Sequence, residues 1–115
     1  MLTKKNLEER YEQVLSATEN KVKVAKSVFK VVSKWCESTL KPFVDAQGGT
    51  VIIDAYGVDI GQRTGPEYDL MHRIIIRLEF NHMNGTVLLG LERLPLDAEV
   101  ITTALADAYI KYSVG

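Results

Sequence analysis

No glycine or proline interrupts residues 4–41, and apolar side chains recur through this stretch at steps of three and four. That spacing predicts an amphipathic helix, because 3.6 residues per turn bring such positions onto one face. One straight helix over this stretch would be about 57 Å long at 1.5 Å per residue. A compact domain of this length has a radius of gyration of only about 13 Å. We therefore expect part of such a helix to project from the body of the protein.

Two interpretations of the same stretch remain open. Ser16 and Glu19 have capping-box spacing, so a first helix over residues 3–18, capped by Thr3, could be followed by a second over residues 20–41. The apolar residues of both segments keep the same phase, however, which favours one continuous or gently bent helix.

The main helix, residues 20–41, carries a broad apolar face and is expected to end before Pro42, which disfavours helical geometry at the preceding residue. The face covers about half of the circumference, which indicates burial against more than one neighbouring element. It consists of Val22, Ala25, Phe29, Val32, Cys36 and Leu40, with Val24, Val28, Val31 and Trp35 beside them. Cys36 is the only cysteine, so an intramolecular disulfide and a CxxC zinc site are excluded, and we expect its thiol to be an inert core group.

The remainder of the chain predicts a three-stranded antiparallel meander over residues 50–94. Its first strand is expected at residues 50–60, and two alternating sets of apolar side chains leave the buried face of this strand open. Residues 61–66 predict a loop, and a long strand follows at about residues 68–82. The third strand ends near Leu94.

The dipeptide Asn84-Gly85 predicts a type I′ hairpin turn between the second and third strands, because both residues tolerate positive φ. With a two-residue turn, Phe80 lies opposite Leu89 on the core side.

A last helix is expected over residues 97–112, with Asp97 as the N-cap and Leu96 and Ile101 at hydrophobic-staple positions. Its predicted buried side consists of Val100, Ile101, Ala104, Leu105, Ala108 and Tyr112. Residues 1–115 therefore predict a single α+β domain, a two-layer α/β sandwich with both main helices on one face of the sheet.

The composition limits the classes of function. Hydrophobic residues make up 46% and charged residues 25%, as in an ordinary globular protein, and the net charge of −1 provides no global field toward nucleic acid or anionic lipid. No apolar run approaches the roughly 20 residues of a membrane span, and no signal peptide is recognisable at the start. We expect a cytoplasmic protein without a membrane contact, a metal or another cofactor.

The candidate interaction residues lie mainly on the predicted helix. Lysines form one stripe of it, acidic residues occupy the same angular face one segment earlier, and apolar residues line the first segment. The candidates are Leu7, Glu8, Tyr11, Glu12, Val14, Lys23, Lys26, Lys30 and Lys34, with the arginines Arg63, Arg73 and Arg77 outside the helix.

Three classes of function follow from these residues. The favoured hypothesis is a non-catalytic protein–protein interaction or adaptor module, acting as a homodimer in which two antiparallel copies bring acidic residues near the lysines. The second is nucleic-acid binding through the lysine stripe, which contains neither arginine nor an interleaved aromatic residue. The third is an enzyme whose site assembles from His72, Asp54, Asp59 or Arg63, although no catalytic motif is present.

Overall fold

The computed structural model describes residues 1–64 and 71–115, and the side chains of residues 1–62 and 74–115. It contains three α-helices, one π-helical turn and five strands. In chain order these are α1 (Lys4–Trp35), η1 (Cys36–Leu40), α2 (Lys41–Ala46), β1 (Gly49–Ile53), β2 (Gly57–Thr64), β3 (Met71–Asn81), β4 (Thr86–Leu89), β5 (Glu92–Leu94) and α3 (Ala98–Val114). The strands form one antiparallel sheet in the order β1-β2-β3-β4-β5. The α+β class is confirmed, but the meander has five strands and not three.

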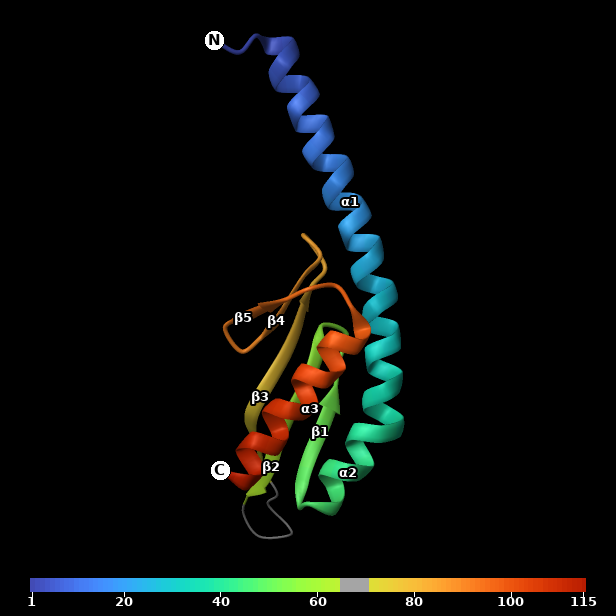
Figure 1. The fold of residues 1–115 in the computed structure, drawn as a ribbon, viewed down its shortest axis with the longest axis vertical. Coiled ribbons are helices and arrows are strands. Elements are labelled where there is room, and N and C mark those ends of the chain that lie inside the picture. The colour runs from blue at the N-terminus through green and yellow to red at the C-terminus, as the bar shows by residue number, and fades with distance from the viewer. Residues whose placement is uncertain (65–70) are drawn as a thin grey trace.

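The N-terminal helix is continuous and projects from the body (Figure 1). Thr3 and Asn6 form a reciprocal capping box at its start, because each side chain accepts a hydrogen bond from the other residue's backbone N–H. The break considered near Ser16 does not occur. The protein measures 64 × 27 × 24 Å, with a radius of gyration of 18.1 Å, well above the roughly 13 Å of a compact domain of this length. The expected projection of the helix is therefore confirmed.

The prediction that Pro42 ends the helix was wrong, since helical structure continues through α2 to Ala46. In a regular α-helix the proline ring would press on the carbonyl of Ser38, four residues earlier. The π-helical turn η1 relieves this conflict, because the N–H of Lys41 donates to the carbonyl of Cys36, five residues back.

The single strand expected at residues 50–60 is a hairpin of β1 and β2, and four residues of the predicted loop belong to β2. Asp54 makes the turn, because its carboxylate accepts hydrogen bonds from the N–H groups of Tyr56 and Gly57 at 2.7 and 2.9 Å. A side chain at Gly57 would collide with the backbone carbonyl of Leu78 on β3, so this position requires glycine. The turn also settles which face of each strand is buried: Val51 and Ile53 of β1 and Val58 and Ile60 of β2 point to the core.

The β3–β4 hairpin forms where expected but with a four-residue connection, so the predicted type I′ turn and its register were wrong. Phe80 pairs with Val87 and not with Leu89. Gly85 has a φ of +70°, whereas no residue other than glycine has positive φ in the part of the chain that the structure describes. The register differs from the predicted one by two residues, which keeps the same side chains on the core face. A further turn at Gly90 separates β4 from β5.

The helices pack on one face of the sheet and leave its other face open (Figure 1). The core joins side chains from α1, η1 and α2 with those of the strands and of α3. The largest fully buried side chains are Phe80, Ile60, Leu78, Ile101, Leu105, Val32, Val44, Val58, Val87 and Cys36. Asp97 caps α3 as predicted. The predicted buried side of α3 was partly wrong: Tyr109 is buried, whereas Val100 and Tyr112 are more than 40% exposed.

Candidate interaction surface

The projecting part of α1, which we call the arm (residues 4–20), exposes an apolar stripe. Its side chains are Leu7, Tyr11 and Val14, which are 54%, 69% and 66% exposed, together with the half-buried Thr18. At 100° per residue these positions fall on the side of α1 on which Ala25 and Val32 are buried. The arm therefore continues the core-facing side of the helix beyond the sheet that covers it.

The hairpin between β3 and β4 marks the boundary between arm and body. A Cβ placed on Gly85 would lie 2.8 Å from the carbonyl carbon and oxygen of Lys21 and 3.0 Å from the nitrogen of Val22. Backbone therefore packs directly on backbone at this point. From here toward the C-terminus the sheet covers the apolar side of the helix, and Ala25, the next stripe residue after Val22, is only 3% exposed.

The acidic residues and lysines predicted to bind a partner are all on the surface of α1. Glu8 and Glu12 are exposed on the arm, and the four lysines are exposed on the body part of the helix. Within the described residues the arm has a single ion pair, between Lys4 and Glu8 at 4.0 Å, and none involves the lysine stripe (Lys23, Lys26, Lys30 and Lys34). Lysine side chains are therefore available to a partner, and the apolar side of the same segment is not.

Arg77 is the one candidate arginine whose side chain the structure describes, since Arg63 and Arg73 lie outside the described side chains. Its Nη1 donates to Asp59 at 2.8 Å and to Asp54 at 3.1 Å on the open face of the sheet. The backbone N–H of Tyr56 and the Arg77 guanidinium hold the pKa of Asp54 below its usual range. These contacts tie the β1–β2 turn to β3, which is a structural role.

Of the residues considered for catalysis, the structure describes the side chains of Asp54 and Asp59. His72 lies outside the described side chains, and Asp54 and Asp59 both bind Arg77. The other histidine, His82, has Nε2 at 2.8 Å from the carbonyl oxygen of Ala55 and packs between aromatic rings. Burial raises the pKa of Cys36 to about 12, so its thiol is inert as expected.

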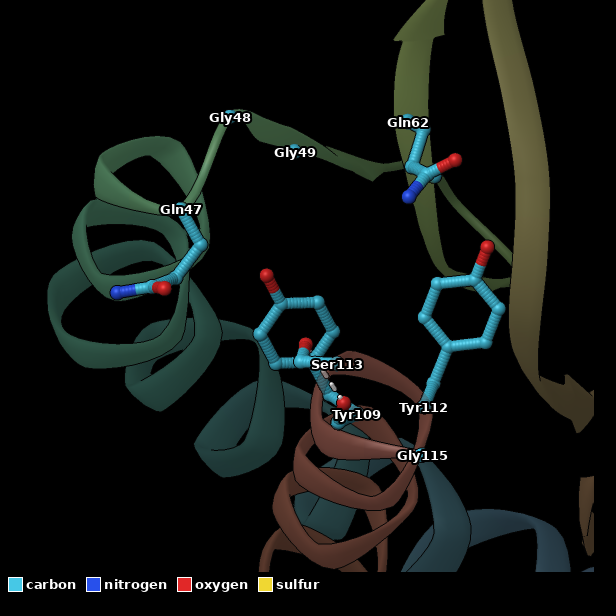
Figure 2. Close-up of a pocket in the computed structure, with 9 residues that line it drawn as sticks. Gln47, Gly48, Gly49, Gln62, Tyr109, Tyr112, Ser113 and Gly115 are labelled. Atoms are coloured by element: carbon cyan, nitrogen blue, oxygen red, sulfur yellow. Dashed lines mark hydrogen bonds between the residues drawn. The ribbon is translucent and has the colours of Figure 1, made fainter.

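A polar cavity of about 680 Å³ (Figure 2) lies near the C-terminus, at the end of the molecule opposite the arm (Figure 1). It is lined by Gln47, Gly48, Gly49, Gly61, Gln62, Tyr109, Tyr112, Ser113 and Gly115. Both tyrosine hydroxyls point away from α3 into the cavity (Figure 2), while the hydroxyl of Ser113 donates to the carbonyl of Tyr109 at 3.0 Å. Among the described side chains this lining offers amides and hydroxyls but no carboxylate, imidazole or amine, and therefore no acid–base pair.

Sequence reasoning missed this cavity, and also an apolar groove of about 130 Å³ between the helices. The groove is lined by Trp35, Thr39, Leu40, Phe43, Ala106, Tyr109 and Ile110. Both sites combine residues from elements that are distant in the chain. Neither the spacing of these residues nor any local motif places them together, so no signal in the sequence identifies either site.

Within residues 1–64 and 71–115, no cluster of three histidine, cysteine or acidic side chains is arranged to hold a metal ion. The helices of that part of the chain include none with the length and apolarity of a membrane span. Comparison of the chain with protein-family models, curated proteins and solved structures gave no match. The arm exposes a row of apolar side chains on an ordered helix.

Proposed function

We propose that this protein is a non-catalytic protein–protein interaction module of adaptor type, and that it acts as a homodimer through its arm. The observation that carries the proposal is the exposure of Leu7, Tyr11 and Val14 along the side of α1 on which Ala25 and Val32 are buried. Contiguous apolar surface of this kind on an ordered element indicates a contact with another chain.

The stability of the arm supports the same proposal. Isolated helices shorter than about 12–15 residues are marginal in water, and most helical stability in proteins comes from packing of an apolar face. The arm is only slightly longer than this limit, and the side chains of residues 4–17 are all exposed. A second helix along the stripe would supply that packing.

Size-exclusion chromatography with light scattering tests the proposal. At about tens of micromolar, where ordinary specific dimers assemble, we expect the wild-type protein to have the mass of a dimer. The double variant Tyr11→Lys, Val14→Lys should have the mass of a monomer and lose helical circular dichroism, because the unpaired arm frays. Val31→Lys is the matched control, since Val31 is 55% exposed on α1 but lies away from the stripe. A wild-type protein that stays monomeric with no dependence on concentration contradicts the proposal.

Nucleic-acid binding is a second candidate, and the exposure of Lys23, Lys26, Lys30 and Lys34 favours it. Within the described residues none of these lysines has an acidic partner within 4.0 Å. Binding of this kind weakens steeply as salt rises, because the lysines release counterions from the phosphates. The candidate predicts a gel shift at low salt that is lost in the variant Lys26→Glu, Lys30→Glu, Lys34→Glu. Absence of a shift with the wild-type protein at low salt rejects it.

A further inference from the structure

The length of the free stripe limits how a second copy can bind. The stripe is open from the first residue of α1, Lys4, to Lys21, where the hairpin residue Gly85 packs on the helix backbone. Any partner helix that lies along this stripe must therefore fit within that interval.

The stripe is symmetric about the middle of this interval. The midpoint of residues 4–21 falls between Glu12 and Gln13, and the stripe residues lie at equal distances on either side of it. Leu7 and Thr18 are the outer pair and Tyr11 and Val14 the inner pair. A second copy that runs antiparallel about this midpoint therefore sets Leu7 against Thr18 and Tyr11 against Val14. Each of the four stripe residues of one chain then faces a stripe residue of the other chain.

A parallel pair does not fit the same surface. In a parallel pair each residue faces its own copy, so the partner's helix would follow α1 into the region of Ala25 and Val32. These side chains are already covered by the chain's own sheet. Since α1 has no break from Lys4 to Trp35, a parallel partner would collide with the body.

The charges of the arm allow the antiparallel alignment. At 100° per residue Lys5, Glu12 and Glu19 lie about 110–150° from the centre of the stripe, so the alignment buries none of these three charges between the helices. The predicted approach of Glu8 and Glu12 to Lys26, Lys30 and Lys34 requires a longer overlap along the lysine face of α1, which is a different face from the stripe.

We infer that the arm binds the arm of a second copy of this chain in antiparallel orientation, with Leu7 opposite Thr18 and Tyr11 opposite Val14. The inference rests on the proposed function, since it specifies the alignment of the homodimer. The resulting dimer is elongated, with the two paired arms at its centre and one body at each end.

Disulfide cross-linking of single-cysteine additions tests the alignment. Leu7→Cys and Thr18→Cys are prepared separately and oxidised either alone or as a mixture. We expect the mixture to give a cross-linked dimer of one copy of each variant, while each variant alone gives little product. In the antiparallel dimer two copies of position 7 are about 16 Å apart along the helices, beyond the roughly 7 Å that a disulfide spans between Cα atoms.

The native thiol of Cys36 does not interfere, because it is fully buried. Val31→Cys is the control, since it is exposed on α1 but lies outside the stripe. Preferential cross-linking within each variant alone shows a parallel or other alignment and overturns the inference, while leaving the proposed homodimer intact. A monomeric wild-type protein contradicts the homodimer itself, so the two failures are distinguishable.

Solution scattering by the unmodified protein provides a second measurement. Two chains of 64 Å that overlap over about 24 Å of arm make a particle roughly 100 Å long, with a bimodal distance distribution. A dimer with both bodies side by side gives a shorter particle with one maximum, and this result also overturns the inference.

Discussion

The arm and the body part of α1 carry the same apolar pattern, yet only one of them is covered by its own chain. Val14 and Val32 lie in phase on one continuous helix; Val14 is 66% exposed and Val32 is fully buried. The periodicity of apolar residues therefore identifies the side of a helix that packs against another element. It does not identify whether the cover comes from the same chain or from another.

The largest expected difference in stability is between two variants that place the same charge in the body part of α1 and in the arm. We expect Val32→Asp to destabilise the protein by about 4 kcal/mol or more, because an unpaired carboxylate would be forced into the core. Val14→Asp should change the unfolding free energy of the monomer by no more than about 0.5 kcal/mol, yet should abolish the dimer. Urea unfolding at low protein concentration and light scattering at high concentration measure the two effects. Equal destabilisation by both variants would show that the arm is part of the folding core.

A smaller loss of stability is expected from a substitution at the boundary between the arm and the body. Gly85→Ala should cost about 2–4 kcal/mol, because the methyl group meets the backbone of Lys21 and the residue has positive φ. Gly48→Ala is the matched control: it also has positive φ but no atom within 4 Å of the added Cβ, so only the backbone cost of about 1 kcal/mol remains. Chemical denaturation of both variants isolates the contact between hairpin and helix. Equal losses would mean that the hairpin does not hold the helix at this point.

The smallest expected effect compares two serines of α1. The hydroxyl of Ser33 is buried and has no hydrogen-bond partner, whereas Ser16 is exposed on the arm. Ser33→Ala should stabilise the protein by about 1–2 kcal/mol, because it removes an unsatisfied hydroxyl and improves helix propensity. Ser16→Ala should contribute only the propensity term, about 0.5 kcal/mol or less. Thermal unfolding resolves the difference, and a loss of stability in Ser33→Ala would indicate a partner for this hydroxyl.

Local chemistry made much of the fold predictable. Thr3 and Asp97 cap helices where the sequence indicates, because capping depends on a side chain and backbone groups two or three residues away. Cys36 is buried because its position within a 3.6-residue period determines its side of the helix. The projection of α1 followed from its length alone.

The sequence-based predictions of the fold were wrong at positions where two helices or strands contact each other. Gly57 begins β2 and lies against the backbone of β3, a contact that no neighbouring residue in the sequence reveals. Pro42 was expected to stop the helix, but packing of Leu40 and Val44 into the core holds the helix together through a π-helical turn. The hairpin at Asn84-Gly85 has the expected residues with a longer connection, because two registers that differ by two residues place the same side chains in the core.

The sequence predicted the residues of the apolar stripe, but not where along the helix a second copy could lie. Leu7, Tyr11 and Val14 follow from periodicity, whereas the point at which the stripe closes depends on Gly85, about 64 residues later in the chain. The longer overlap predicted from the acidic and basic faces of α1 stays a prediction, because these side chains are exposed on the helix.

The π-helical turn η1 also has a consequence for changes in chain length. In an uninterrupted α-helix Val44 would lie about 80° from the direction of Cys36; one extra residue accommodated in the turn reduces that angle to about 20°. The turn is thus equivalent to a single-residue insertion that restores the alignment of Val44 with the core. Relatives of this protein that differ by one residue in helix length should carry the difference here, since an insertion or deletion in the arm would shift the stripe out of line with the sheet.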